Sequence, residues 1–392
     1  MATSSPARAR VDACPGALQT HAAADGALAR VRLPGGALAA DQLRVLAAAA
    51  RELGDGALEL TSRGNVQLRG LRTGAETDLG DRLAAAGLLP SATHERIRNV
   101  LASTLSGRTT GGLVDVRGWV ARFDAGLCAD PLFADLPGRF LATLDDGRSD
   151  VAGLGGDIGL LALDPATIAL TLGGIDSGLR TSPAEAVGLA LAATRAFLDE
   201  RADQGGSAWR LVELRDGPAR VAGRLGGART TLVDVPAAPA TGLAGALPQL
   251  DGRTALIAVV PLGRLTAAQA ELLTRLAPEL QVTPWRSIAI PDLTHAGAPA
   301  AEMAISAGLV VDAESPWLQV TACAGRPGCA RSLADVRADA VAAVASGTLP
   351  ASGDRQHWAG CQRRCGRPGG DAVDVVATGS GYRIDIHRAE KS

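Results

Sequence analysis

The sequence predicts an α+β protein made of two related halves. A unit of strand, Pro-Gly turn and amphipathic helix at residues 29–54 returns at residues 255–276. The matched positions, at a constant offset, are Pro34, Gly36, Leu38 and Gln42 with Pro261, Gly263, Leu265 and Gln269. A duplicated unit of this length indicates two pseudo-symmetric halves. The alternative is coincidence in a sequence rich in Ala and Leu, and the matched Pro and Gly residues argue against it.

The first copy has a strand at 29–33, the turn Pro34-Gly-Gly36 and then a helix. The helix is indicated by Leu43, Leu46, Ala50 and Leu53, which recur at spacings of three and four, and Gly54 follows its end. Strands are expected at 57–60 and 66–70, joined by Thr61-Ser-Arg-Gly-Asn65.

The second copy has a strand at 255–260, a turn at 261–263 and a helix at 265–276, and Thr283-Pro-Trp-Arg286 echoes Thr61-Ser-Arg63. The run 235–242, rich in Pro and Ala, reads as the linker between the halves. Before it, a strand is expected at 141–144, and a capping box at Ser182–Glu185 opens a helix to about residue 202. A further helix is expected at about 330–345.

Four of the six cysteines form two close pairs near the C-terminus. Cys323 and Cys329 are separated by five residues, and Cys361 and Cys365 by three. A 4Fe–4S cluster needs four thiolates that converge on one point. A Cys-x3-Cys step places two sulfurs on one face of a helical turn, and Gly325, Pro327 and Gly328 let the first pair form a loop. The spacing favours a 4Fe–4S site on these four residues.

Three other readings of the cysteines are weaker. Structural zinc sites use gaps of two to four residues and often His, whereas the first gap is longer and only His357 lies close by. Disulfides are typical of secreted proteins, and the N-terminus lacks the apolar run of a secretory signal. The third reading is four unrelated core cysteines. Cys14 and Cys128 have no partner spacing and are interpreted as packing residues.

Composition excludes several classes of function. A net charge of −2 gives no general field that would attract nucleic acid or an anionic membrane. No apolar run reaches the length of a membrane span. We expect a cytoplasmic protein, since a thiol-bound cluster suits a reducing compartment, and a disordered tail at residues 1–12.

The cysteine spacing resembles the cluster motif of the sulfite and nitrite reductase superfamily, and the likeness runs from Cys14 to about residue 386. It implies two ferredoxin-like half-domains and two reductase-type α/β lobes in a pseudo-twofold arrangement. The implied divisions are a half-domain at 13–88, a lobe at 89–235, a linker and second half-domain at 236–300, and a lobe with the cysteines at 301–392. In that superfamily the last thiolate, here Cys365, bridges the cluster to a sirohaem iron.

Residues of the tetrapyrrole pocket can be carried over by motif. Arg63 is similar to the first basic position of the pocket and Arg98 to the second. Leu-Pro-Gly-Arg139-Phe-Leu141 resembles a Leu-Pro-x-Lys-Phe-Lys segment whose two lysines face the substrate. Arg139 keeps the first charge, whereas Leu141 carries none, which argues against reduction of sulfite or nitrite.

Within the superfamily, the precorrin-3B synthase family of aerobic cobalamin biosynthesis is more similar. The motifs that carry this likeness are Cys14-Pro-Gly16, Arg30-Val-Arg-Leu-Pro-Gly-Gly36, Thr61–Gly70, Thr283-Pro-Trp-Arg286 and Ala322–Cys329. The likeness implies an oxygen-dependent monooxygenase that hydroxylates a meso carbon of precorrin-3A and closes a lactone. Its partners would be precorrin-3A, O2 and an external electron donor, NADH-linked or ferredoxin-like.

Both enzyme readings require a pocket for a macrocycle with many carboxylates, which arginine binds in a bidentate manner. The candidates are Arg63, Arg69, Arg98, Arg139 and Arg286; for each, a surface or salt-bridging role is the alternative. An additional mononuclear non-haem iron would need His and carboxylate ligands, but His94 and His357 read as structural hydrogen-bonding residues. Trp285 reads equally as a pocket or a core residue. A non-catalytic iron–sulfur or zinc protein is the remaining class.

Overall fold

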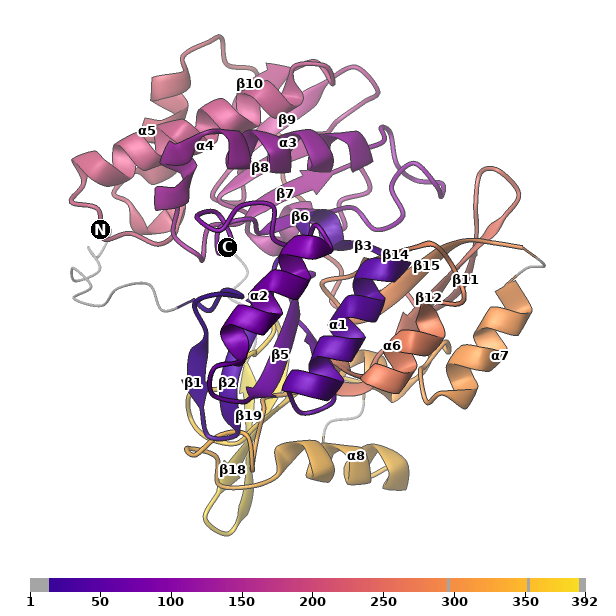
Figure 1. The fold of residues 1–392 in the computed structure, drawn as a ribbon. Coiled ribbons are helices and arrows are strands. Elements are labelled where there is room, and N and C mark those ends of the chain that lie inside the picture. The colour runs from indigo at the N-terminus through magenta and orange to yellow at the C-terminus, as the bar shows by residue number, and fades with distance from the viewer. Residues whose placement is uncertain (1–13, 295–296, 351–352, 388–392) are drawn as a thin grey trace.

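The computed structural model describes residues 14–294, 297–350 and 353–387 (Figure 1). The predicted tail at 1–12 lies outside these residues. The described part is a mixed α+β structure with four sheets, as the sequence predicted. Two central sheets lie in the middle of the molecule, and a lobe lies at either end (Figure 1). Among the described residues, no helix combines the length and apolar character needed to cross a membrane.

The first central sheet and its two helices form half-domain 1. Its strand order is β1–β2–β5–β4–β13, with β1 at His21–Ala23, β2 at Gly26–Val31, β5 at Val66–Leu71, β4 at Ala57–Leu60 and β13 at Arg264–Thr266. The helices α1 (Ala40–Leu53) and α2 (Ala75–Ala85) pack on one face of this sheet. Residues on the opposite face of the strands, such as Arg30, Glu59 and Arg69, are therefore left to face the lobes.

The second central sheet forms half-domain 2 in the same way. Its order is β11–β12–β15–β14–β3, with β11 at Gly245–Pro248, β12 at Thr254–Val259, β15 at Ser287–Leu293, β14 at Glu279–Val282 and β3 at Ala37–Ala39. Its helices are α6 (Ala267–Leu273) and α7 (Ala298–Ser306). The short helical turns η1 (Pro34–Gly36) and η5 (Pro261–Gly263) occupy the matched Pro-Gly positions of the repeat.

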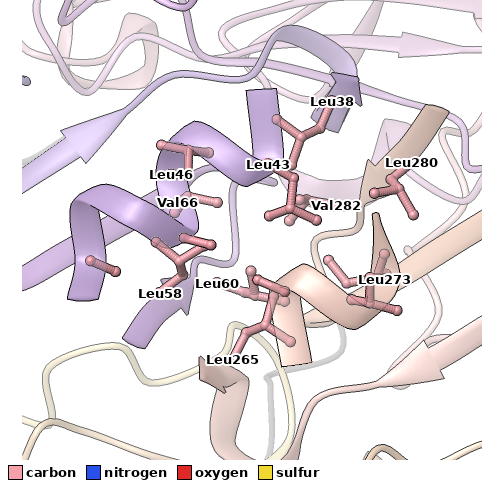
Figure 2. Packing of buried hydrophobic residues seen from close by; sticks show 14 of the residues in the cluster. Leu38, Leu43, Leu46, Leu58, Leu60, Val66, Leu265, Leu273, Leu280 and Val282 are labelled. Atoms are coloured by element: carbon pink, nitrogen blue, oxygen red, sulfur yellow. The ribbon is translucent and has the colours of Figure 1, made fainter. Parts of the chain in front are cut away.

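The two half-domains exchange one strand each. β13 comes from the second half but pairs with β4, which places Leu265 opposite Leu58. β3 comes from the first half but pairs with β14, which places Leu38 opposite Leu280. Figure 2 shows these leucines in one shared hydrophobic core, which spans both half-domains. The sequence did not indicate this exchange.

Lobe 1 is a five-stranded sheet with three helices. Its order is β10–β9–β8–β7–β6, with β6 at Val100–Ala102, β7 at Ala142–Asp145, β8 at Ile158–Ala162, β9 at Ile168–Leu172 and β10 at Ile175–Thr181. The helices are α3 (Arg117–Ala129), α4 (Ala186–Asp203) and α5 (Gly217–Leu225), with short turns η2 (Pro131–Asp135), η3 (Ala152–Leu154) and η4 (Leu211–Glu213). β6, β7 and β8 run parallel, and β9 and β10 are antiparallel additions.

Lobe 2 repeats this plan on a smaller scale. β16 (Val320–Ala322), β17 (Gln356–Ala359) and β18 (Ala372–Thr378) are parallel, and β19 (Gly381–His387) closes the sheet antiparallel to β18. Helix α8 (Val336–Ser346) joins β16 to β17, as α3 lies between β6 and β7 in lobe 1, and the turn η7 (Pro316–Leu318) precedes β16.

Three predicted helix boundaries differ from the structure. The helix expected at 330–345 begins at Val336, where the Asp335 side chain accepts a hydrogen bond from the Ala338 N–H. The helix expected at 265–276 is shorter, because Leu265 belongs to the exchanged strand β13. The Ser182 capping box forms a turn that precedes α4, in which the Glu185 N–H donates to the Ser182 carbonyl.

Candidate functional site

The four paired cysteines lie at one end of lobe 2. Cys323 follows β16 and Cys361 follows β17, and these strands are parallel neighbours whose carboxyl ends meet at one edge of the sheet. All four thiols are free, and the other three act electrostatically on Cys365. Burial raises the pKa of the Cys365 thiol; Arg363 opposes this, and the other three cysteines add to it. The structure thus places the four cysteines in the loops at one end of lobe 2, and their role as cluster ligands stays a prediction.

The loop geometry differs from the prediction in one respect. The segment from Cys361 to Cys365 is a turn and not part of a helix, because Arg364 has a φ of 46°. The prediction that these two thiols lie one helical turn apart was wrong. The loop of the first pair is as expected: Gly325 has a φ of 67°, and a side chain there would lie 2.9 Å from Val336.

The four thiols are the type of donor that iron–sulfur clusters take. Among the described residues, no three His, Cys, Asp or Glu side chains are gathered as a site for one ion. Zinc needs its four ligands at about 2.0–2.3 Å from one centre, whereas a cubane cluster takes one thiolate at each of four separate irons. The residues that could hold such a cluster are Cys323, Cys329, Cys361 and Cys365, as the spacing predicts. The described part of the chain gives no ligand set for an additional mononuclear iron.

In lobe 1, the residue that follows the first parallel strand makes the same pair of hydrogen bonds as Cys323 does in lobe 2, although it is a serine. The Cys323 N–H donates to the Trp358 carbonyl (3.0 Å), and the Gly360 N–H donates to the Cys323 Sγ (3.2 Å). In lobe 1 the Ser103 N–H donates to Leu144 (3.1 Å), and the Asp146 N–H donates to the Ser103 Oγ (3.0 Å). The two lobes thus have equivalent positions after their first parallel strands, and the cysteine lies in lobe 2.

Three arginines outside the loops hold the cysteine loops in place. Arg69 on β5 donates to the Gly328 carbonyl (2.9 Å) and makes a bidentate pair with Asp25 at 3.0 Å. Arg337 on α8 donates to the Cys323 carbonyl (3.2 Å) and pairs with Glu59.

Arg286 completes this set from half-domain 2, where it donates to the Gly366 carbonyl (3.2 Å), one residue beyond Cys365. Arg69 and Arg286, predicted to contact a tetrapyrrole, are thus placed against the cysteine loops. Arg69 makes most of its contacts with Asp25 and Gly328, while burial lowers the pKa of Arg286.

A second group of arginines, which we call the arginine cluster, lies where half-domain 1 meets lobe 1. It comprises Arg30, Arg32, Arg63, Arg139 and Arg210, whose charges act on one another. Arg63 lies in the turn between β4 and β5, and no described residue makes a hydrogen bond or ion pair with its side chain. Burial, and then the charges of Arg210 and Arg30, lower the pKa of Arg63 to about 10.

Arg30 and Arg32 are functional candidates that the sequence reasoning missed. Arg32 is 2% exposed and donates to the Arg96 and Pro15 carbonyls, yet its Nη1 has no partner among the described residues. Burial, and then the charge of Arg30, lower the pKa of Arg32 to about 9. The alternation of residues along the strand could have indicated them. Ala29 and Val31 are buried on one face of β2, so Arg30 and Arg32 point to the other face.

The remaining motif residues are placed differently from one another. Arg139 is exposed, and its guanidinium stacks 4.8 Å from the Trp209 ring. Arg98 is buried in a bidentate pair with Asp124 (2.6 and 2.7 Å) and lines a separate cavity of about 550 Å³ beside α3 and η1. Leu141 is 3% exposed and packs against Leu101 in the core. The structure groups Arg63 and Arg139, but not Arg98.

Cys14 also lies near the arginine cluster. Its charge acts on Arg30, Arg32 and Arg63, and the peptide that follows it is held by Arg32. Cys14 was interpreted as a packing residue, but its neighbours include charged arginines. Cys128 is half-buried on α3, where burial raises the pKa of its thiol.

The histidines and Trp285 make structural contacts. His94 is buried between the Ser91 hydroxyl (2.7 Å from Nδ1) and the Asp130 carbonyl (3.1 Å from Nε2). His357 is fully buried with Nδ1 at 2.9 Å from the Thr321 hydroxyl, and burial followed by the charge of Arg286 lowers its pKa to about 3. The Trp285 indole donates to the Pro239 carbonyl (3.1 Å) and holds the linker.

Comparison with known proteins identifies the repeat unit and the fold. Residues 21–86 match the family model of the nitrite/sulfite reductase ferredoxin-like half domain. The chain is similar to a ferredoxin–nitrite reductase of Synechococcus elongatus, with 27% identity over 93% of this chain and 78% of that protein. It is similar to a precorrin-3B synthase of a Sinorhizobium species, with 26% identity over 97% of this chain and 83% of that protein.

The structure resembles that of the Mycobacterium tuberculosis NirA protein, with a TM-score of 0.73 and 22% identity over 92% of this chain and 74% of that one. This likeness shows that the chain has the nitrite/sulfite reductase-type fold with ferredoxin-like half-domains. The comparisons therefore show this fold and, at residues 21–86, the ferredoxin-like half domain, while the two long relatives are similar at 27% and 26% identity.

Proposed function

We propose that this chain is an oxygen-dependent monooxygenase of cobalamin biosynthesis. It converts precorrin-3A to precorrin-3B by hydroxylating a meso carbon and closing a lactone from a ring acetate. One oxygen atom of O2 enters the product and the other leaves as water, which requires two electrons from an external donor. Cys323, Cys329, Cys361 and Cys365 would hold a 4Fe–4S cluster that passes these electrons singly.

The observation that carries the proposal is the uncharged residue at a position where the resemblance calls for a lysine that faces the substrate. This residue, Leu141, is part of the core, and the cations near the site are the guanidinium groups of the arginine cluster. A guanidinium binds a carboxylate through paired N–H donors but does not release a proton near neutral pH. Such a set suits recognition of a polycarboxylate macrocycle. Proton-consuming reduction of a small oxyanion is favoured by residues that can donate protons.

The residues of the chain would divide the task between the two groups described above. The arginine cluster would bind and orient the acid side chains of the macrocycle, with Arg63 offering a guanidinium that no described residue occupies. Arg69, Arg286 and Arg337 would keep the cysteine loops in position through the carbonyls of Gly328, Gly366 and Cys323.

The second candidate is a sirohaem-dependent sulfite or nitrite reductase. The similarity to a nitrite reductase, about as high as to the precorrin-3B synthase, favours it. In that case the macrocycle would be a resident sirohaem cofactor, and the cluster held by the four cysteines would supply it with electrons. A non-catalytic iron–sulfur or zinc protein is less well supported, because an electron carrier does not need the arginine cluster.

The two enzymes are distinguished by purifying the protein without air and recording its absorption spectrum with iron and sulfide counts. We expect four irons and four sulfides per chain, a broad cluster shoulder without sirohaem bands, and conversion of added precorrin-3A only when O2 and reductant are supplied. Intense sirohaem bands together with nitrite or sulfite reduction would replace the proposal with the reductase. Zinc in place of iron would exclude both.

A further inference from the structure

One carboxylate is buried in the sheet of lobe 2, on a strand that is otherwise apolar around it. Asp374 lies in β18 between Val373 and Val375 and is 0% exposed. Val375 packs with residues of helix α8 in the core of the lobe, so the Asp374 side chain lies on the opposite face of the sheet. A buried carboxylate costs free energy unless cations or hydrogen-bond donors pair with it.

The main partners of Asp374 come from the loop that carries Cys361 and Cys365. Arg367 donates from Nε to both oxygens of Asp374 (2.9 and 3.1 Å). The Arg364 Nε lies 2.9 Å from one of these oxygens. One arginine lies between the two cysteines and the other lies two residues after Cys365, so the carboxylate holds the loop at two points.

Two groups of the edge strand β19 complete these surroundings. Asp385, which pairs with Asp374 in the sheet register, accepts a hydrogen bond from the Arg364 Nη2. The Nε2 of His387 lies 3.1 Å from Asp374. Arg364 and Arg367 thus face two carboxylates of the sheet, which balance their charges.

Lobe 1, which has no paired cysteines, has no carboxylate at the equivalent place. The hydrogen bonds that the two lobes share make Thr143 of lobe 1 the counterpart of His357 in lobe 2. The partner of His357 on the next parallel strand is Asp374, whereas the partner of Thr143 is Gly159. The shared fold of the lobes therefore does not require the carboxylate, which occurs in the lobe that carries the cysteines.

We propose that Asp374 positions Cys361 and Cys365, the second pair of thiolates of the site. This rests on the cluster cysteines of the proposed function and not on the reaction assigned to the chain. The loop turns at Arg364, whose φ is 46°, and its two arginines are fixed on a group that the sheet holds still. Asp374 would thus orient two ligands that it does not touch, as residues around metal sites do.

The test compares Asp374→Asn, which keeps the size of the side chain and removes its charge, with a matched control in lobe 1. The control is Asp176→Asn, because Asp176 is also a buried carboxylate on a strand and binds Arg180 at 2.8 and 2.7 Å. Breaking a buried ion pair destabilises a protein, so urea unfolding is recorded for each variant. Arg367→Met is the second variant, because it leaves Asp374 paired with Arg364 and decides the test if Asp374→Asn does not fold.

Two readouts are specific to the loop. In the protein with its cluster, a chelator should bleach the cluster about tenfold faster in Asp374→Asn than in the wild type, and Asp176→Asn should stay within about twofold. In the metal-free protein, iodoacetamide should alkylate the half-buried Cys361 about tenfold faster, since a hydrogen bond to a charged group is worth about that factor. Mass spectrometry of the peptides should show unchanged rates for Cys323 and Cys329. Arg367→Met should give both effects at a smaller size.

The outcomes separate this inference from the proposed function. Unchanged alkylation of Cys361 in both lobe 2 variants would overturn the inference. Equal acceleration at Cys323, Cys329 and Cys361 would also overturn it, because Asp374 would then support the whole lobe and not this loop. A wild-type protein without iron and sulfide, in which alkylation of Cys361 still depends on Asp374, would overturn the proposed function and support the role of Asp374 in the loop.

Discussion

The exchanged strand β13 predicts that one core substitution in the second half weakens both half-domains. Leu265 is fully buried, lies opposite Leu58 and belongs to the core that both central sheets share. Replacing a fully buried leucine by alanine costs about 3 kcal/mol, from lost apolar burial and the cavity that remains. With an m-value of about 3 kcal/mol/M, the urea midpoint of Leu265→Ala should fall by about 1 M.

The assay is equilibrium unfolding in urea, followed by far-UV circular dichroism and by tryptophan fluorescence. Both signals should shift together, since β13 belongs to the second half in sequence and to the first sheet in space. The control is Leu250→Ala, because Leu250 is 66% exposed and its loss should change stability by less than about 0.5 kcal/mol. A loss below about 1 kcal/mol for Leu265→Ala, or two separate transitions, would refute the reasoning.

Two further predictions concern the cysteine loops and lobe 1. Arg69→Met removes the hydrogen bond to the Gly328 carbonyl, so a chelator should bleach the cluster about tenfold faster than in the wild type, by analogy with lost outer-shell contacts at metal sites. The control is Arg82→Met, a half-buried arginine on α2 that should leave this rate unchanged. Equal rates for all three proteins would contradict the role of Arg69. Burial, and then the charge of Asp145, raise the pKa of Asp150 to about 6 from its usual 3.8. The folded state thus binds this proton more tightly than the unfolded chain, and stability falls as pH rises from about 4 to about 6, by about 3 kcal/mol for this one group. Asp150→Asn should remove that part of the pH dependence in urea unfolding, and an unchanged slope would contradict it.

Much of the fold followed from local pattern. The spacing of three and four between Leu43, Leu46 and Ala50 predicted a helix, which is α1 in the structure. Gly54 follows its last residue. The repeated Pro-Gly turns gave the two half-domains. The strand exchange could not be predicted in this way, because β3 and β13 have three residues each and their pairing depends on partners more than 200 residues away.

Candidate site residues could be predicted where residue type and spacing are enough to identify them. They could not be predicted where the role of a side chain depends on the residue that it contacts in the fold. Residue type and spacing led to the four cysteines, which the structure places in loops at one end of lobe 2. Two of the predicted arginines bind other residues of the chain. Arg69 pairs with Asp25 and donates to the Gly328 carbonyl, and Arg98 pairs with Asp124. No local signal in the sequence shows which acid lies opposite a given arginine.

The reciprocal exchange of strands has the geometry of a two-fold dimer whose protomers have been fused. Leu38 meets Leu280 in one sheet as Leu265 meets Leu58 in the other, the self-complementary contact of an isologous, strand-swapped pair. The segment 235–242 is then the covalent link between two protomers that the exchanged strands already hold together. Opening the backbone there would leave two fragments that stay associated, because each holds a strand that the other's sheet requires.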